Sequence, residues 1–269
     1  MKMMMKVLAV TAALLMFCMP AMAAGVDGSL TEIIMHEKLV LGLDPTFAPL
    51  GYTEEDGSIV GFDIDVATEV CARLGVELVC QPIAWEAKEM ELNNKNIDCI
   101  WNGMSISPDR MASMLISTPY MSNAMILVVR ADSGIVDKAG LSGKKLGVQG
   151  GSTAEEALDE DEEFKASLGD VVYFDYNSEA LMDLRQGGLD AVLMDLVVAE
   201  YYITTEQADL VCLEETLMPE EYGIGFRKND QALHDKVDEI LFEMDEDGTL
   251  AKISEKWFGT DLTTIKNYR

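Results

Sequence analysis

Short apolar strands and amphipathic helices alternate along this chain in two successive sets, and this alternation constrains the fold more than any other feature. In the first set, an apolar segment over 38–43 precedes a helix in which Ile64, Val70 and Leu74 recur at helical spacing before Gly75. A second set begins near residue 125. Alternating strands and helices fold into parallel sheets with helices on both faces. The sequence therefore predicts an α/β protein with two lobes.

The sequence also predicts a hairpin and further strands and helices in both sets. Residues 51–59 are predicted to form a hairpin around Asp56-Gly57, and a buried strand over 97–101 ends at Asn102-Gly103. The chain closes with two helices, over 231–245 and 249–257. The second set is predicted to contain helices over 178–186 and 197–203, and strands over 125–129, 146–149, 171–174, 191–194 and 210–213.

The first 23 residues have the three parts of a signal peptide. Lys2 and Lys6 give a positive start, residues 7–17 are apolar, and Ala21-Met22-Ala23 offers a cleavage site between small residues. The apolar segment is too short to span a bilayer. Cys18 follows a phenylalanine where a lipobox requires a small residue, so we expect no lipid anchor. We therefore expect an exported protein that works in the periplasm or another extracytoplasmic space.

The charge balance excludes a nucleic-acid partner. The chain has 48 acidic and 20 basic side chains, which gives a formal net charge of −28. A nucleic-acid-binding protein needs a basic surface to face the phosphates. A disordered acidic tail would not contain 49% hydrophobic residues. We therefore expect a folded protein whose partner is not a nucleic acid.

No pattern for covalent catalysis or metal binding is present in the sequence. Gly-x-Ser-x-Gly is absent, and both histidines fall in predicted surface helices. The cysteines that follow the signal peptide have no zinc spacing. We therefore expect no catalytic residue, no metal and no cofactor. Export would permit a Cys71–Cys80 disulfide, which the sequence leaves open, whereas Cys99 in an apolar run is typical of a buried free thiol.

Polar residues gather where the predicted strands end, at Asp44, Asn102-Gly103, Gln149 and Asp195. Ligands of open α/β sheets bind outside the carboxyl ends of the strands. Asp195 can cap the next helix or hold a cation. The turn 150–153 can bind a carboxylate at a helix start or simply cap that helix.

Arg110 follows the predicted strand end at Asn102-Gly103. Its planar guanidinium can pair with a carboxylate, or it can lie on the surface.

Several blocks of the sequence together resemble the extracellular solute-binding proteins of the polar amino acid class, which are the receptors of ABC importers. The first block, Gly61-Phe62-Asp63-Ile64-Asp65-Val66-Ala67, is similar to a signature of that family. The resemblance continues in order and spacing through the segments 43–49, 97–110, 117–120, 146–153 and 248–259.

The resemblance implies the type II fold of periplasmic binding proteins, in which two crossing hinge strands join two α/β lobes. It assigns residues 28–123 and 223–269 to lobe 1, and residues 124–222 to lobe 2. Related receptors carry a disulfide near Cys71, but Cys80 lies two residues later than the partner found in them, which leaves that bridge in doubt.

The resemblance also assigns the groups that hold the ligand backbone. Arg110 would bind the α-carboxylate, with backbone N–H groups near Ser105 and Thr153. Asp195 would bind the α-ammonium, with the Ser105 hydroxyl and the Gly103 carbonyl. Opposite charges at two ends of one site would hold a zwitterion.

Other positions would contact the ligand side chain. Phe47 and Trp85 fall where the family stacks aromatic rings on it. The residues that fall where specificity is read are Asp44, Asn102, Gln149 and Met194. Since Asp44 disfavours an acidic ligand, a neutral polar or cationic amino acid is expected.

The resemblance thus implies a binding protein that delivers an amino acid to an ABC transporter permease. Two alternatives remain open. Exported cyclohexadienyl or arogenate dehydratases resemble these receptors and would need a general acid over a leaving group. A ligand sensor that docks on a membrane receptor would share the same pocket.

Overall fold

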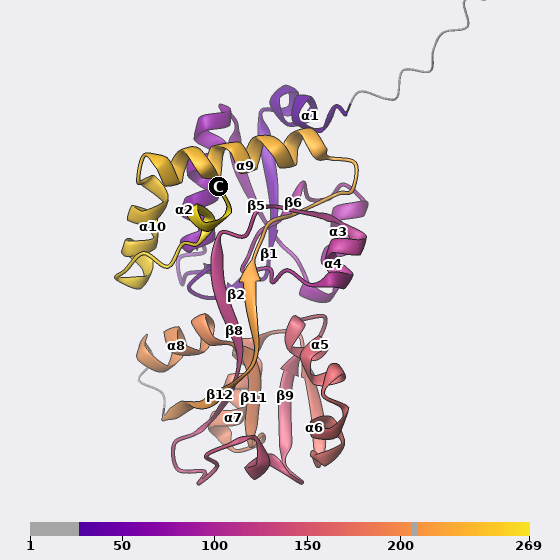
Figure 1. The fold of residues 1–269 in the computed structure, drawn as a ribbon, viewed down its shortest axis with the longest axis vertical. Coiled ribbons are helices and arrows are strands. Elements are labelled where there is room, and N and C mark those ends of the chain that lie inside the picture. Colours follow the sequence, from indigo (N-terminus) through magenta and orange to yellow (C-terminus); the bar gives the residue numbers. More distant parts are fainter. Residues whose placement is uncertain (1–26, 206–208) are drawn as a thin grey trace, which may run out of the picture.

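The computed structural model describes residues 27–205 and 209–269, which form two lobes stacked along the long axis of the molecule (Figure 1). Each lobe is built on its own sheet, so the predicted two-lobe α/β fold is confirmed. The predicted signal peptide and Cys18 lie outside the described residues.

The sheet of the first lobe has the strand order β5-β1-β6-β13-β7. Strand β1 (Lys38–Leu43) is apolar and pairs in parallel with β5 (Glu77–Pro82) and β6 (Cys99–Ile100). Strand β13 (Gly225–Phe226) is antiparallel to both β6 and β7 (Leu115–Ile116). A smaller sheet holds the predicted hairpin, with the strands β2 (Thr46–Phe47), β3 (Gly51–Thr53) and β4 (Ile59–Val60).

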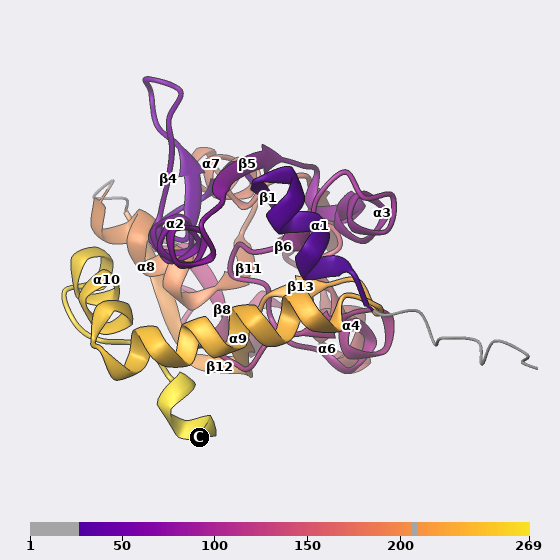
Figure 2. The same cartoon turned by 90° about the horizontal axis from the view of Figure 1, so that it is seen from above.

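Helix α2 (Phe62–Leu74) packs on this sheet through an apolar stripe. Phe62, Val66 and Val70 are fully buried, and Gly75 ends the helix in the left-handed conformation, with φ 74°. Helix α9 (Gln231–Glu246) runs beside α1 (Ser29–His36), so both ends of the described chain meet on one lobe (Figure 2). The other helices of this lobe are η1 (Trp85–Ala87), α3 (Lys88–Asn93), α4 (Pro108–Ser113), α10 (Thr249–Phe258) and η3 (Ile265–Tyr268).

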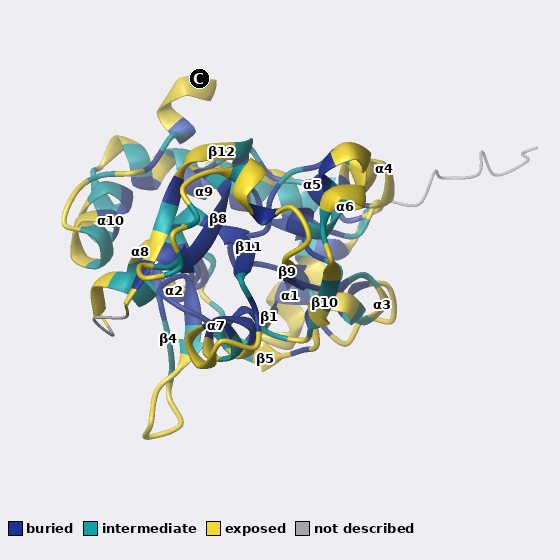
Figure 3. Cartoon of the chain, turned by 90° about the horizontal axis from the view of Figure 1, so that it is seen from below, coloured by how far each residue is buried: buried dark blue, intermediate teal, exposed yellow. Residues whose placement is uncertain are grey.

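The sheet of the second lobe has the order β10-β9-β11-β8-β12. Its strands β8, β9 and β11 form the buried centre in Figure 3. The strands are β8 (Met121–Arg130), β9 (Lys145–Gln149), β10 (Asp170–Phe174), β11 (Ala191–Asp195) and β12 (Leu210–Tyr222). The helices are η2 (Lys138–Leu141), α5 (Thr153–Glu160), α6 (Glu162–Ser167), α7 (Asn177–Gln186) and α8 (Leu196–Thr205).

The prediction of parallel sheets was wrong in part, because both sheets are mixed. Strands β8 and β12 pair antiparallel from Met121 opposite Tyr222 to Arg130 opposite Leu210. They run between the lobes in opposite directions, since the chain enters the second lobe along β8 and leaves it along β12 (Figure 1). This crossing pair is the expected hinge. The lobe boundaries at 123/124 and 222/223 fall within β8 and at the end of β12, and they stay predictions.

The strand predicted over 210–213 in fact continues to Tyr222. Glu214, Glu215 and Pro219 are exposed and interrupt its apolar pattern. The pairing register with β8 also shifts twice between Cys212 and Met218. Because β12 passes from one lobe to the other, it is not buried along its whole length. It therefore lacks the regular apolar pattern from which a strand can be predicted.

The four cysteines of the described residues are free thiols, and Cys71 and Cys99 are buried. A Cys71–Cys80 bridge, left open by the sequence, is therefore not formed here. Within 27–205 and 209–269, no helix combines the length and the apolar character needed to cross a bilayer.

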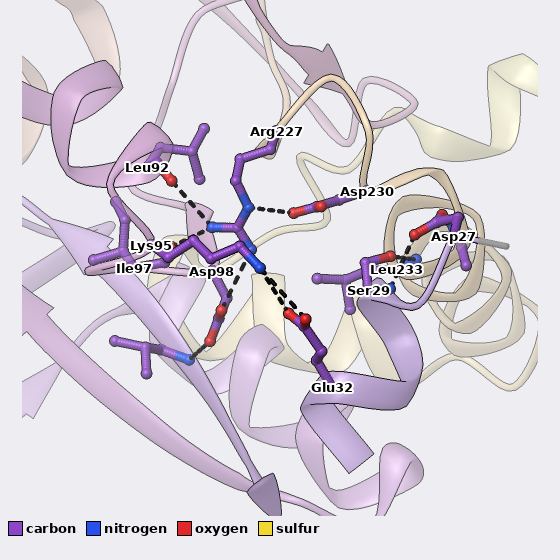
Figure 4. A network of polar contacts seen from close by, with 12 residues as sticks. Asp27, Ser29, Glu32, Leu92, Lys95, Ile97, Asp98, Arg227, Asp230 and Leu233 are labelled. Atoms are coloured by element: carbon purple, nitrogen blue, oxygen red, sulfur yellow. Dashed lines mark hydrogen bonds and ion pairs between the residues drawn. The ribbon is translucent and has the colours of Figure 1, made fainter. Parts of the chain in front are cut away.

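A largely buried arginine connects the returning C-terminal segment to the first lobe (Figure 4). Arg227 follows β13, and its Nη1 donates to the carbonyls of Leu92 at 3.1 Å and Ile97 at 2.7 Å. Its guanidinium also pairs with Asp98 at 3.5 Å and Asp230 at 2.6 Å. The network joins the segment after β13 to the loop between α3 and β6.

Replacing Arg227 with methionine should lower the free energy of unfolding by about 3–5 kcal/mol, because two carboxylates lose their partner in a largely buried site. Urea denaturation followed by circular dichroism would measure the change. Lys95→Met provides the control, since Lys95 pairs with Glu32 on the surface in the same region and should change stability by less than about 1 kcal/mol. Equal losses in the two variants would contradict this assignment.

Candidate functional site

A narrow cavity lies between the lobes. The structure brings all ten predicted site residues to its wall, together with Ser152, which the sequence analysis did not include. Met194 is buried in β11 next to Asp195 but is not part of the wall. The lining residues are Asp44, Phe47, Trp85, Asn102, Gly103, Ser105, Arg110, Gln149, Ser152, Thr153 and Asp195.

The cavity lies where strands of both sheets end. Asp44 follows β1 directly, and Asn102 and Gly103 follow β6 after one further residue. Gln149 and Asp195 are the last residues of β9 and β11. Gly103 adopts φ 56°, and a Cβ atom there would lie 2.7 Å from the Phe47 ring, so the turn requires glycine.

Arg110 provides a buried positive charge at one end of the cavity. It lies in the first turn of α4, and its side chain is 4% exposed. Nη1 donates to the Ser105 carbonyl at 2.8 Å, and Nη2 donates to the Gly151 carbonyl at 3.2 Å across the lobes. Burial lowers the pKa of Arg110, while the carboxylates of Glu156, Glu220 and Asp195 oppose that change. A guanidinium remains charged in such surroundings.

Asp195 lies at the end of β11, with donors from both crossing strands around it. Asn123 Nδ2 on β8 and the Tyr222 hydroxyl on β12 each donate to its Oδ1 at 2.7 Å. Burial raises the pKa of Asp195 to about 7, and the neighbouring Glu220 carboxyl adds to the shift. The crossing strands therefore position this acid as well as joining the lobes.

Glu220, on β12, is a further buried acid that sequence reasoning missed. Ser105 Oγ donates to its Oε2 at 2.8 Å, and burial raises the pKa of its carboxyl. Glu220 and Tyr222 are two residues apart and are both buried, as strand alternation requires for one face. Had the segment up to Tyr222 been identified as a strand, this period of two would have pointed to Glu220.

Asp44 lies on the cavity wall beside a fixed amide. Gln149 Nε2 donates across the lobes to Asp44 Oδ2 at 2.8 Å, and Thr46 N–H donates to Asp44 Oδ1 at 2.8 Å. Asn177 Nδ2 donates to Gln149 Oε1 at 3.1 Å, which holds the amide of Gln149 in this orientation. Burial raises the pKa of Asp44, while the hydrogen bonds from Thr46 and Gln149 favour its charged form.

Aromatic groups and a second cation complete the first-lobe side. Phe47 and Trp85 are buried on the wall, and Lys88 Nζ lies 5.1 Å from the centre of the Trp85 ring. Lys88 Nζ also donates to the Gly151 carbonyl at 2.8 Å. Together with the contacts of Arg110 and Asp44, this bond shows that the lobes are closed over the cavity.

The turn before α5 is an ordinary helix cap that also forms part of the wall. Ser152 is the N-cap and accepts the N–H of Glu155 at 3.3 Å. The side chain of Glu155 also contacts the turn, since its Oε2 accepts a hydrogen bond from the Gly151 N–H at 2.8 Å. Thr153 begins the helix and is 3% exposed. The helix cap expected from the sequence is therefore present, and the binding of a ligand carboxylate at this turn stays a prediction.

In the described part of the chain, no cluster of three or more histidine, cysteine, aspartate or glutamate side chains could hold a metal ion. The polar groups of the cavity are instead hydrogen-bonded to one another and to backbone atoms. They can bind an organic ligand that carries both charges, with an anionic group near Arg110 and a cationic group near Asp195.

Comparisons with known proteins agree with this architecture. The chain is 33% identical over 239 residues to the L-cystine-binding protein TcyJ of Escherichia coli, a match that covers 88% of each chain. A substrate-binding protein of an ABC uptake transporter from Streptococcus pneumoniae, solved with bound histidine, is 35% identical with a TM-score of 0.86. That match covers 88% of this chain and 98% of the other.

A further solved structure, Tv2483 bound to L-arginine, is 31% identical with a TM-score of 0.85, and the match covers 89% of this chain and 98% of that one. The family model for bacterial extracellular solute-binding proteins, family 3, matches residues 39–260. This match spans both lobes, the crossing strands and every residue of the cavity wall. The chain belongs to family 3 of the bacterial extracellular solute-binding proteins.

Proposed function

We propose that this protein is an extracytoplasmic receptor that captures a free amino acid between its lobes and delivers it to an ABC transporter permease. The observation that carries the proposal is the placement of Arg110 and Asp195, two buried groups of opposite charge, on the wall of one closed cavity. The membership of the chain in a family of solute-binding proteins supports the same function.

The charges suit the backbone of an amino acid. The guanidinium of Arg110 has donor capacity for a carboxylate, and backbone N–H groups near Ser105 and Thr153 would add to it. Asp195 would accept the α-ammonium, together with the Ser105 hydroxyl and the Gly103 carbonyl. Because an unpaired buried charge costs several kcal/mol, a zwitterion that pairs with both ends binds far better than a ligand with one charge.

The other wall residues select the ligand side chain. Phe47 and Trp85 would pack on its apolar part, and Asp44 beside Gln149 and Asn102 would meet a polar or cationic end group. An acidic side chain would repel Asp44, so we propose a ligand with a cationic or neutral polar side chain. The similar proteins named above carry cystine, histidine or arginine in their names, and those ligands have such groups.

Lobe closure would trap the ligand. Arg110 belongs to the first lobe and Asp195 to the second, so a ligand that bridges them favours the closed form. The crossing strands β8 and β12 would act as the hinge. The proposed site binds and releases without chemistry, and we propose a monomeric, exported protein whose signal peptide ends at residue 23.

A thermal-denaturation screen of the refolded, ligand-stripped protein against the common amino acids and cystine tests the receptor function. Saturation at a hundredfold excess over Kd should add about 2.7 kcal/mol of apparent stability for the true ligand. Turnover of arogenate or prephenate, without a shift by any amino acid, would instead favour the dehydratase alternative. Copurification with a permease would distinguish import from sensing.

Arg110→Ala should weaken binding of the ligand found in this screen by at least about 30-fold, because it removes one partner of a buried charge pair. Isothermal titration calorimetry would measure the loss. Arg185→Ala is the matched control, since Arg185 is exposed on α7 and away from this cavity. Unchanged affinity in Arg110→Ala, with the protein folded, would refute the site assignment.

Asp44→Asn should change ligand preference rather than remove binding. A cationic ligand such as L-arginine should lose about tenfold or more, because a hydrogen bond to a charged group contributes about 1.5–3 kcal/mol. The Kd of L-glutamine should change by less than about threefold, since the introduced amide keeps an oxygen that can accept the N–H of a neutral ligand. Parallel titrations with both amino acids measure the difference, with Asp56→Asn at the exposed hairpin turn as control. An equal loss for both ligands would place the ligand side chain elsewhere.

A further inference from the structure

Glu220 is a buried carboxyl group beside the cavity that the proposed function leaves without a role. It is 7% exposed, and its Oε2 accepts hydrogen bonds from Ser105 Oγ at 2.8 Å and Asn123 Nδ2 at 3.0 Å. The Thr153 side chain lies near enough to lower the pKa of Glu220. Even so, Oε1 is buried and accepts no hydrogen bond of regular geometry from the described residues. A buried carboxylate oxygen without a hydrogen-bond donor raises the free energy of the folded protein. A proton or a cation bound at Glu220 would remove this cost.

Glu220 and Asp195 form a pair through one shared donor. Asn123 Nδ2 donates both to Asp195 Oδ1 at 2.7 Å and to Glu220 Oε2 at 3.0 Å. Two carboxylates on the same amide nitrogen repel each other when both are ionised in a buried site. Burial raises the pKa of each carboxyl, and the Coulomb interaction with Glu220 raises that of Asp195 further. The pair therefore favours a state that holds one shared proton.

The surrounding groups compensate this pair only in part. Arg110 favours the ionised form of both carboxyls, but its Nε also lies 3.8 Å from Glu156. The Tyr222 hydroxyl donates to Asp195, and burial keeps the pKa of that hydroxyl well above its usual value. Arg110 thus interacts electrostatically with three carboxyl groups, those of Asp195, Glu220 and Glu156. A ligand carboxylate would compete with them for its guanidinium.

We propose that Glu220 is a second residue that recognises the ligand ammonium group, and that ligand binding displaces a proton shared by Asp195 and Glu220. The proposal rests on the proposed function, because it requires an amino acid with its ammonium at Asp195. The incoming ammonium brings one positive charge and up to three N–H donors. The proton leaves to solvent, so the net charge at the pair stays the same while Oε1 of Glu220 gains a donor.

The affinity for the ligand should depend on pH, because the shared proton and the ligand ammonium occupy the same pair of carboxyl groups. A lower pH favours the protonated pair, and this proton competes with the ligand ammonium. The Kd of the ligand should therefore rise as pH falls through the pKa of the pair, and it should level off above that pKa. The site would then select primary ammonium groups over neutral analogues by offering two carboxylates to one cation.

Isothermal titration calorimetry with L-arginine tests the proposal, since the guanidinium of this probe does not titrate. With a pKa of about 7 for Asp195, the wild type should bind about 15-fold more weakly at about pH 5.5 than at about pH 7. Titrations near pH 6.5 in two buffers of different ionisation enthalpy should show release of most of one proton per ligand bound.

In Glu220→Gln the burial of Asp195 remains but the repulsion from Glu220 is gone, so the Kd for L-arginine should change less over the same range than it does in the wild type. The variant should also release a smaller fraction of a proton. Glu214→Gln, an exposed acid on the same strand, should behave like the wild type. Burial also raises the pKa of Asp44 on the cavity wall, and Asp63 and Lys88 titrate near the cavity with pKa values of about 7 and about 8, but all three remain in Glu220→Gln. A smaller pH dependence in that variant therefore assigns the proton to the pair.

The possible results distinguish a failure of the proton displacement from a failure of the receptor function. If the wild type binds L-arginine with a pH-independent Kd and releases no proton, the proton displacement is refuted while the receptor function stands. If Glu220→Gln keeps the full pH dependence, Glu220 is not part of the titrating pair. If neither L-arginine nor any other amino acid binds at any pH, the proposed function itself fails. The two-buffer measurement needs no variant, so a folding defect in Glu220→Gln would not prevent a decision.

Discussion

Burying unlike charges in one cavity is the constraint on which the rest of this structure depends. A guanidinium and a carboxyl group on the wall of one narrow cavity are kept away from water, and each needs partners to offset its lost hydration. The second lobe supplies a carbonyl to Arg110 through Gly151, and the crossing strands supply Asn123 and Tyr222 to Asp195. The contacts that compensate the charges are thus the contacts that join the lobes.

The crossing strands therefore have a mechanical and an electrostatic role. Strands β8 and β12 connect the sheets, and near the first lobe they place Asn123, Glu220 and Tyr222 around one acid. A change in the angle between the lobes would alter the bonds across the cavity, which are those of Arg110 and Lys88 with Gly151 and that of Gln149 with Asp44. The acid cluster on the strands would change less. The site thus contains a part preformed on the hinge and a part completed by closure.

Much of this organisation could be predicted from local sequence. Strand β1 and helix α2 stand out because their apolar residues face one continuous core, and a strand-end rule then led to Asp44, Asn102, Gln149 and Asp195. The part of β12 after Leu213 could not be recognised in this way, since the exposed Glu214, Glu215 and Pro219 do not follow a buried pattern. Glu220 was missed for the same reason. Its environment comes from Ser105 and Asn123, which are distant in sequence, and no local pattern reports such a contact.

The order of strands in the first sheet has a consequence for how the chain acquires its structure. Strand β13 lies between β6 and β7, although it comes from residues 225–226, more than a hundred residues later. The second sheet, in contrast, is made entirely from residues 121–222. A chain that emerges from its N-terminus can therefore complete the second sheet while the first still has a gap. Since non-local pairings are slow to form, the sheet of the first lobe can be completed only after nearly the whole chain is available.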